Sequence, residues 1–326
     1  MPLKLDCTLE VWPLAEPFGI SSQVEIEAEA LVVSLHEDGV TGRGEGNGVY
    51  FRGETGATMM AQIEAVRSRI EAGLDRQALL ALLPPGGARN AVDCALWDLE
   101  AKRTGHRAAE LAGVTTSPFR TLATVGLDTP QAMARKAKAL DFAGTVKVKL
   151  GADAPLACLE AVRAARPDAR LVVDANQAWS LEQLNALWPP LKTLGVEMIE
   201  QPLAAGADAE LRQGQCGVLL GADESCHTLA DLAYLSGRYG MINIKLDKTG
   251  GLTEALAMAQ EARAQGFEVM VGNMIGTSLA MAPASLLAPL CRYVDLDGPL
   301  LLATDRHPGM LYAGDLVTPA AAEVWG

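Results

Sequence analysis

Five short apolar runs decide the fold of this chain, and each ends on or near a charged side chain. They read TVKVKL at 145–150, RLVVDAN at 170–176, VEMIEQP at 196–202, VLLGADES at 218–225 and MINIKLDK at 241–248. The charged positions follow one another at steps of about 25 residues, the length of one strand plus one crossover helix. Because a parallel α/β barrel brings the C-terminal ends of its strands to one rim, we expect these charges to meet there.

Three further runs with strand character complete a set of eight. We expect strands at 121–126, 145–150, 170–174, 196–200, 218–222, 241–246, 268–272 and 292–296. Eight strands that alternate with helical segments indicate a barrel rather than an open doubly wound sheet. No G-x-G-x-x-G follows a strand and there is no P-loop, so nothing in the sequence favours nucleotide binding.

The first third of the chain has a different pattern. Residues 3–50 indicate antiparallel strands with a hairpin turn at Asp38-Gly39, and two helices follow, the second closed by Gly105. We therefore expect a small α+β domain over residues 1–115 and a barrel over 116–299. A loop-like tail, from about residue 300 to 326, is expected to pack back on the small domain.

Composition excludes several classes of protein. The 326 residues carry a net charge of −13, which argues against nucleic acid and anionic membranes as partners. No apolar run is long enough to span a bilayer, and the N-terminus lacks the pattern of a secretory signal. The six cysteines are scattered without a CxxC pair, which is typical of reduced thiols. The sequence thus predicts a cytoplasmic protein, and it leaves open whether the chain forms a homo-oligomer.

Three carboxylates at successive strand ends, Asp174, Glu200 and Asp223, indicate a metal site. A single Asp after a strand is more often a turn or N-cap residue, but three in a row are hard to explain in that way. Oxygen ligands without His or Cys favour a hard cation, Mg²⁺ before Mn²⁺. Asn176, Glu224 and Ser225 are expected as neighbours that support this site.

Lysines flank the three carboxylates in the sequence. Lys147 and Lys149 are two apart on a strand, so both face the barrel interior, where the acidic positions can pair with them. Lys245, expected on the strand after Asp223, lies across the barrel mouth from Lys149. A cation and a second lysine nearby should lower its pKa, as a general base requires. Lys248 is expected to leave the strand and face solvent.

Two more carboxylates, Asp295 and Asp297, share a face if the eighth strand continues through them. Away from the three-carboxylate cluster, they could hold a substrate ammonium group. The alternative is an acidic loop before Gly298-Pro299, and these residues alone favour neither reading.

The motifs KVKL, VDAN, EQPL, ADES and NIKLDKTGGL together resemble the enolase superfamily, muconate-lactonising subgroup. ALWDLEAKRTG is similar to a helix of the capping domain in that subgroup, and DLDG at 295–298 is similar to the dipeptide epimerases, of the L-Ala-D/L-Glu type. The resemblance covers nearly the whole chain. It implies a (β/α)7β barrel with an N-terminal α+β capping domain, one Mg²⁺, and a dipeptide as substrate.

The resemblance also implies a role for each residue of the site. Asp174, Glu200 and Asp223 match the Mg²⁺ ligands. Lys149 and Lys245 match two acid/base lysines, one on each face of the substrate α-carbon, and Lys147 matches the lysine that helps Mg²⁺ stabilise the enolate. Asp295 and Asp297 match the pair that holds the α-ammonium of the dipeptide. The implied reaction is a 1,1-proton transfer that inverts the α-carbon of the C-terminal residue.

One loop departs from the L-Ala-D/L-Glu type, in which an arginine after the first strand pairs with the glutamate side chain of the substrate. Here the stretch GISSQVEIE has Ser22 and Gln23, with Glu25 and Glu27 as its nearest charges. Ser22 and Arg52, of the loop GVYFRGET, are the candidate substrate contacts on this side. The substrate side chain is therefore open, and a neutral or cationic residue is an alternative to glutamate.

Two other functions remain in view. Within the subgroup, an N-acylamino acid racemase, an o-succinylbenzoate synthase or a cycloisomerase would share the lysines and metal ligands. Such an enzyme has no need of carboxylates that hold a substrate ammonium group, so Asp295 and Asp297 distinguish a dipeptide epimerase from these alternatives. A non-catalytic small-molecule binding barrel is the alternative from another class, and it gives no reason for two lysines to face each other.

Overall fold

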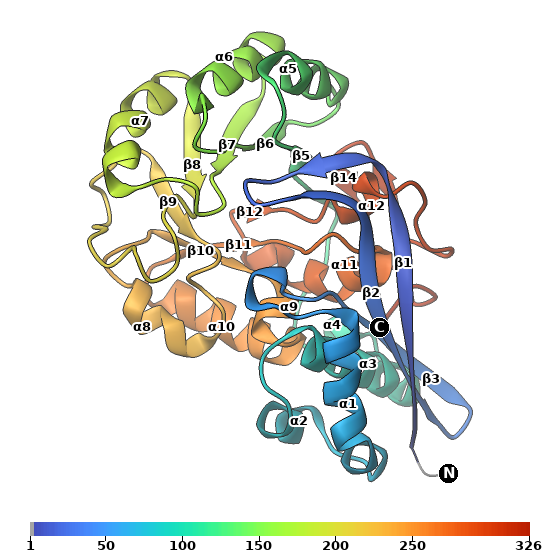
Figure 1. The fold of residues 1–326 in the computed structure, drawn as a ribbon. Helices are drawn as coiled ribbons and strands as arrows, with labels where there is room; N and C mark the ends of the chain where they lie inside the picture. Colours follow the sequence, from blue (N-terminus) through green and yellow to red (C-terminus); the bar gives the residue numbers. More distant parts are fainter. Residues whose placement is uncertain (1–2) are drawn as a thin grey trace.

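The computed structural model describes residues 3–326 and is built around a curled parallel sheet (Figure 1). Its eight strands, in spatial order from β12 to β5, follow their order in the chain. They are β5 (Ala123–Val125), β6 (Thr145–Lys149), β7 (Arg170–Asp174), β8 (Val196–Glu200), β9 (Leu219–Ala222), β10 (Met241–Ile244), β11 (Glu268–Val271) and β12 (Tyr293–Val294). All eight predicted strands are present, although several end earlier than expected. Leu122 N donates to Val294 O at 2.7 Å, which brings the first and last strands together.

Helices follow most of these strands and cover the outside of the sheet (Figure 1). They are α5 (Pro130–Ala139), α6 (Pro155–Ala165), α7 (Leu181–Thr193), α8 (Leu232–Leu235), α9 (Leu246–Thr249), α10 (Leu252–Ala264), α11 (Ser278–Ala284) and α12 (Gly298–Leu301), with short 3₁₀ turns at Leu229–Asp231 and Ser285–Leu290. Their starts follow the sequence: Thr129 caps α5 with Pro130 in its first turn, and Ser180 forms a capping box with Gln183.

The connection between β8 and β9 contains no helix in residues 201–218, so the crossover helix expected between Glu200 and Asp223 is wrong. Gly206 and Gly214 have φ of 83° and 81° there, a backbone conformation that a helix cannot include. The segment instead forms a series of turns, and the spacing of the carboxylates is kept without a helix.

The interior of the curled sheet is apolar at one end and charged at the other. Strand registers place Val172 opposite Lys147 and Met198 opposite Val172, so these side chains share a face. Val172 and Met198 belong to a buried cluster with Leu122, Met241, Met270 and Tyr293. That cluster closes the interior below the lysines, and it leaves the charged groups at the C-terminal ends of the strands.

A three-stranded antiparallel sheet precedes the parallel one, as predicted. It consists of β1 (Lys4–Gly19), β2 (Val24–Glu37) and β3 (Val40–Gly46), and Asp38-Gly39 makes the turn with φ of 49° and 82°. Next come the 3₁₀ turn η1 (Tyr50–Arg52) and the helices α1 (Gly56–Glu71), α2 (Arg76–Leu82), α3 (Gly87–Thr104) and α4 (Ala108–Leu111). Gly105 ends α3 in the left-handed conformation, as expected.

The β1–β2 hairpin extends from this small sheet to the parallel sheet (Figure 1). Leu127 N, just after β5, donates to Gly19 O at 2.8 Å. A Cβ at position 19 would lie 2.3 Å from Leu127 O, so only glycine allows this close approach. The hairpin tip is thereby held beside the C-terminal ends of the strands.

The C-terminal tail is more regular than the predicted loop. After α12 it forms β13 (Tyr312–Ala313) and β14 (Leu316–Val317), which pairs with β4 (Phe119–Arg120). The last residues contact α3, where Trp325 Nε1 donates to Cys94 O at 3.0 Å and Gly326 N to Asp98 Oδ1 at 2.7 Å. The domain boundaries at 115 and 299 stay a prediction.

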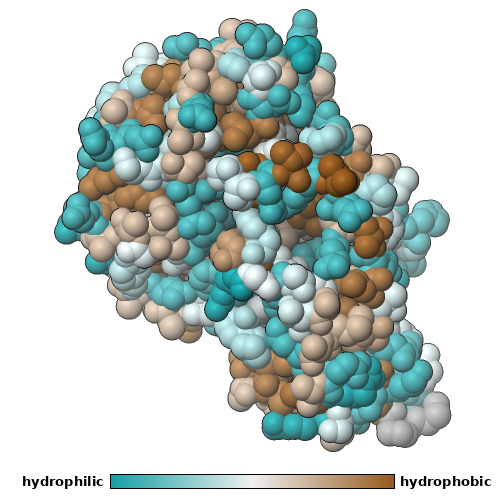
Figure 2. All heavy atoms as spheres, in the orientation of Figure 1, coloured by the Kyte–Doolittle hydropathy of each residue, from teal (hydrophilic) through white to brown (hydrophobic). Residues whose placement is uncertain are grey.

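Hydrophilic and apolar residues are mixed in small groups on the face that Figure 2 shows. No helix within residues 3–326 has the length and apolar character that crossing a membrane requires. All six cysteines are free thiols.

Candidate active site

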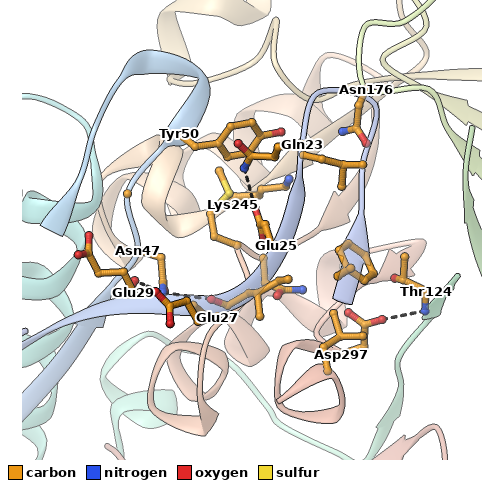
Figure 3. A pocket seen from close by; sticks show the side chains of 18 of the residues that line it. Gln23, Glu25, Glu27, Glu29, Asn47, Tyr50, Thr124, Asn176, Lys245 and Asp297 are labelled. Carbon is orange, nitrogen blue, oxygen red and sulfur yellow. Dashed lines mark hydrogen bonds between the residues drawn. The ribbon is translucent and has the colours of Figure 1, made fainter. Parts of the chain in front are cut away.

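A cavity of about 300 Å³ lies between the hairpin and the C-terminal ends of the strands (Figure 3). Most of its polar lining residues come from two sources, strand ends and the small domain. From the strand ends come Thr124, Lys147, Lys149, Asn176, Lys245, Asn273, Asp295 and Asp297, and from the small domain come Gln23, Glu25, Glu27, Glu29, Asn47, Tyr50, Glu54 and Thr55. The three lysines predicted to carry the chemistry therefore line one cavity.

Lys147 and Lys149 both point into the interior, as the two-residue strand period predicted. Lys147 Nζ lies 2.8 Å from Glu200 Oε2 and 3.1 Å from Asp174 Oδ2, and Lys149 Nζ lies 2.7 Å from Asp174 Oδ2. Burial lowers the pKa of Lys147, but the surrounding carboxylates raise it by more, to well above its usual value. The ammonium group of Lys147 thus stays charged.

Each carboxylate predicted to bind metal has one oxygen fixed by a donor from the protein. Asp174 Oδ1 accepts from Asn176 N at 2.9 Å, and Glu200 Oε1 accepts from Asn243 Nδ2 at 2.6 Å. Asp223 Oδ1 accepts from Lys248 Nζ. The second oxygens of all three face lysine ammonium groups. Those of Glu200 and Asp223 are buried without a hydrogen bond of good geometry.

Lys248 is where the sequence prediction was wrong. It is completely buried, and its Nζ donates to Asp223 Oδ1, to Asp223 O at 2.6 Å and to Asn243 O at 2.9 Å. The cause is that β10 ends at Ile244, and α9 begins directly after Lys245. The first turn of α9 carries Lys248 back under the strand ends, whereas a longer strand would have carried it outward.

Lys245 follows β10 instead of lying on it, and its Nζ is 2.8 Å from Asp223 Oδ2. Burial lowers the pKa of Lys245, but Asp223 and Glu200 raise it by more, so the pKa lies above its ordinary value. The expected lowering of this pKa counted a divalent cation next to the lysine. Among the side chains alone, the expectation is wrong because the carboxylates dominate.

The residues around the cavity fit a divalent cation by their charge. Four buried ammonium groups, of Lys147, Lys149, Lys245 and Lys248, stand against the six buried carboxyl groups of Asp174, Glu200, Asp223, Glu224, Asp295 and Asp297. If all are ionised, two negative charges are left over. Burial and neighbouring carboxylates accordingly raise the pKa of Glu224 to about 8 and that of Asp297 to about 7. A divalent cation would compensate the same excess.

The three carboxylates do not form a closed ligand set, and no group of three such residues within 3–326 is arranged as one. Lysine ammonium groups lie against their free oxygens instead. Burial raises the pKa of Asp174, but Lys149 and Lys147 outweigh it and set the pKa to about 2. Asp174 is therefore ionised at neutral pH, which is the form a metal ligand needs.

Asp295 and Asp297 both line the cavity, but not for the predicted reason. β12 ends at Val294, so the strand period does not extend to them, and Asp297 caps α12. Asp297 Oδ2 accepts from Thr124 N at 2.8 Å. Asp295 Oδ2 lies 2.8 Å from Lys147 Nζ, so the expected separation from the carboxylate cluster is also wrong. Asp295 Oδ1 is buried without a partner, as a site for a cationic ligand requires.

The structure does not bring Ser22 and Arg52 to the cavity. Both are exposed, and neither is among the lining residues. Their neighbours take that place: Gln23 lines the cavity beside Ser22, and Tyr50, at the start of η1, lines it in place of Arg52. Ser21 Oγ donates to Asn176 O at 2.9 Å and thereby ties the hairpin tip to the end of β7.

Helix α3 positions the segment that carries Lys245 and Lys248. Asp247 Oδ1 accepts from Asn47 N and from Asn90 Nδ2, each at 2.8 Å, and Arg89 donates to Thr249 O and Gly250 O. The expected neighbours are only partly at the site. Asn176 Nδ2 reaches the buried Glu224 at 3.3 Å, whereas Ser225 Oγ donates to Asp208, away from the cavity.

Sequence reasoning missed Lys248, Asn243 and Gln201, whose Oε1 accepts from Asp223 N at 2.9 Å. Asn243 lies two residues before Lys245, so the strand period could have placed it on the interior face. Lys248 lies three residues after Lys245, which is one helical turn. Gln201 had no such pattern, because its backbone has a positive φ of 33° directly after β8.

Comparison with known proteins agrees with this geometry. Residues 4–113 match the mandelate racemase / muconate lactonizing enzyme N-terminal domain, and residues 131–307 match the enolase C-terminal domain-like family. An L-Ala-D/L-Glu epimerase of Escherichia coli is 48% identical over 306 residues, 93% of this chain and 95% of that protein. An N-acetyl-D-glutamate racemase of Pseudoalteromonas is 46% identical over 253 residues, 78% of this chain and 80% of that protein.

A solved structure covers the whole fold. The crystal structure of an enolase family member from Agrobacterium tumefaciens, described as homologous to dipeptide epimerases, contains sodium and L-Ala-L-Glu with an ordered loop. It superimposes with a TM-score of 0.97 at 47% identity over 100% of both chains. The chain therefore belongs to the mandelate racemase / muconate lactonizing enzyme family of the enolase superfamily.

Proposed function

We propose that this protein is an isomerase, a Mg²⁺-dependent dipeptide epimerase that inverts the α-carbon of the C-terminal residue. The observation that carries the proposal is that two lysines and the carboxylate pair Asp295 and Asp297 line one cavity, and that both lysines contact the buried carboxylate cluster. Its similarity to epimerases over more than nine-tenths of the chain supports the same reaction. In fold terms, we infer that the curled sheet is a closed (β/α)7β barrel, because Leu122 bonds to Val294 across its ends.

Lys149 and Lys245 are the proposed acid and base. They extend from β6 and from the end of β10, which lie four strands apart in the eight-stranded sheet, and both line the cavity. The neutral amine of one takes the proton from the substrate α-carbon, and the electron pair of that C–H bond moves into the adjacent carboxylate to give an enolate. The ammonium group of the other then delivers a proton to the opposite face. The centre is inverted, and the two lysines have exchanged protonation states.

The metal ligands in this proposal are Asp174, Glu200 and Asp223. Mg²⁺ bound there would supply positive charge to the substrate carboxylate where negative charge develops. Lys147, whose raised pKa keeps it charged, would stabilise the same oxygens. Asn243 and Lys248 hold Glu200 and Asp223 in place from behind.

Asp295 and Asp297 favour a dipeptide over an N-acyl amino acid. The amino terminus of a dipeptide is an ammonium group, and Asp295 Oδ1 is a buried acceptor without a partner. An N-acyl amino acid carries no charge at that position, and it would leave the two carboxyl groups uncompensated. The similarity to an N-acetyl-D-glutamate racemase keeps N-acylamino acid racemisation as the second candidate. A cytoplasmic location and a homo-oligomer stay predictions.

The proposal is tested by incubating the protein with Mg²⁺ and L,L-dipeptides in D₂O and recording mass spectra. We expect one hydrogen at the C-terminal α-carbon to exchange and the L,D-epimer to accumulate. N-acylamino acids, run in parallel, should not react. Exchange in N-acylamino acids alone would overturn the proposal in favour of the second candidate, and no exchange in either class would exclude both.

A further inference from the structure

The outer wall of the cavity is formed by β2, and it is acidic. Glu25, Glu27 and Glu29 alternate along this strand, and all three line the cavity (Figure 3). Val24 and Ile26 take the intervening positions and are exposed at 67% and 64%. The two-residue period places the three carboxylates along the cavity, where Glu25 is half-buried and Glu27 and Glu29 are exposed to solvent, and Ala28 between them is buried.

No lysine or arginine within residues 3–326 pairs with these three glutamates. Glu25 Oε1 accepts from Gln23 Nε2 at 2.8 Å, and Glu29 Oε2 accepts from Gly56 N. The side chain of Glu27 has no hydrogen bond or ion pair in the same described residues. The outer wall therefore presents negative charge that no lysine or arginine side chain in the described part of the chain neutralises.

The cations that line the cavity are already engaged. Lys147, Lys149 and Lys245 each lie within 3.1 Å of the carboxylate cluster or of Asp295. An acidic substrate side chain would therefore meet like charge at β2, and every lysine that lines the cavity is already paired with a carboxylate. Asp295 Oδ1, buried and without a hydrogen-bond partner, lines the same cavity at the end where the proposed function places the α-ammonium group, so a cationic side chain would bind elsewhere along the cavity.

Resting on the proposed epimerase function, we propose that the residue whose α-carbon is inverted carries a cationic side chain, that of lysine or arginine, which Glu25 and Glu27 bind. The place of this side chain along the cavity follows from where the tip of the β1–β2 hairpin lies. Ser21 Oγ bonds to Asn176 O, beside the metal-binding end of β7, whereas Asp295 and Asp297 lie at β12. Glu25 is thus near the carboxylate end of the bound dipeptide, and the ammonium end lies away from it.

The experiment compares four dipeptides as substrates of the Mg²⁺-loaded protein: L-Ala-L-Lys, L-Ala-L-Gln, L-Ala-L-Glu and L-Lys-L-Ala. The lysine side chain of L-Ala-L-Lys would form a charge-assisted hydrogen bond with the glutamates, whereas the glutamate side chain of L-Ala-L-Glu would meet like charge. We therefore expect kcat/KM for L-Ala-L-Lys to exceed that for L-Ala-L-Glu by at least about a hundredfold. A higher kcat/KM for L-Ala-L-Glu, for L-Ala-L-Gln or for L-Lys-L-Ala would overturn the inference and leave the epimerase function intact. Absence of exchange in all four would instead contradict the proposed function.

Variants identify the glutamates as the cause. Glu25→Gln should raise KM for L-Ala-L-Lys by roughly tenfold and leave kcat and the turnover of L-Ala-L-Gln unchanged, because it removes side-chain binding alone. Glu25→Lys should shift the preference toward L-Ala-L-Glu. Glu16→Gln is the matched control, because Glu16 lies on the partner strand β1, is 65% exposed and does not line the cavity. An unchanged ratio of L-Ala-L-Lys to L-Ala-L-Gln turnover in Glu25→Gln and Glu27→Gln would contradict the proposal.

Discussion

Replacing Lys248 by methionine tests whether this lysine stabilises the carboxylate cluster. Lys248 is buried against that cluster, although it was predicted from the sequence to face solvent. The change keeps most of the side-chain volume and removes three contacts, to Asp223 Oδ1, Asp223 O and Asn243 O. Removing one partner of a buried ion pair costs about 3–5 kcal/mol of unfolding free energy. Because Lys245 still lies 2.8 Å from Asp223, we expect the lower end, about 3 kcal/mol.

Urea denaturation measures this loss. With an m-value near 3 kcal/mol/M, the midpoint of Lys248→Met should fall by about 1 M. Lys138→Met is the control, because Lys138 is exposed on α5 and its replacement should change the unfolding free energy by less than about 0.5 kcal/mol. A midpoint for Lys248→Met within about 0.2 M of the control would refute the reasoning, because the ion pair would then contribute almost nothing.

Two further predictions concern buried carboxyl groups. Burial raises the pKa of Asp93 to about 6, above its usual 3.8, so the stability that its protonation contributes is complete below about pH 4 and is lost as the pH rises through 6. Urea unfolding should therefore show Asp93→Asn gaining stability relative to the wild type over that pH window, with no further change above it. A difference in unfolding free energy that stays constant with pH would contradict this. Mg²⁺ at 100 times its dissociation constant should stabilise the protein by about 2.7 kcal/mol, and Glu200→Gln should remove most of that gain in a thermal unfolding scan, whereas an equal gain in the variant would exclude Glu200 as a ligand.

Much of the fold could be predicted because its strands are short β-branched runs bounded by turns. Lys147 and Lys149 illustrate this: one strand and its two-residue period suffice to place both of them inside. Strand ends are harder, since β10 stops one residue before Lys245 and β12 two residues after it begins. The two wrong predictions, that Lys248 faces solvent and that Asp295 lies apart from the carboxylate cluster, both follow from misplaced strand ends. The burial of Lys248 and the contact of Asp295 with Lys147 each depend on the residue at which the strand ends.

Contacts between distant segments could not be predicted from local patterns. The tail strand β14 pairs with β4 over two residues, which is too short to leave a periodic pattern. The cavity wall from β2 depends on how the hairpin lies against the parallel sheet, which Gly19 and Ser21 decide through contacts more than 100 positions away in the chain. The sequence showed that Glu25 and Glu27 are present, but only the structure places them in the same cavity as the lysines.

The most direct test of the central claim measures inversion and hydrogen exchange in variants that lack one lysine. In D₂O with Mg²⁺, the wild type should convert an L,L-dipeptide to the L,D-epimer with deuterium at the inverted carbon. Lys149→Met and Lys245→Met should each slow epimerisation by roughly a thousandfold, and each should still exchange the α-hydrogen of only one epimer, because one base remains on one face. Epimerisation at near wild-type rate in either variant would contradict two-lysine proton transfer.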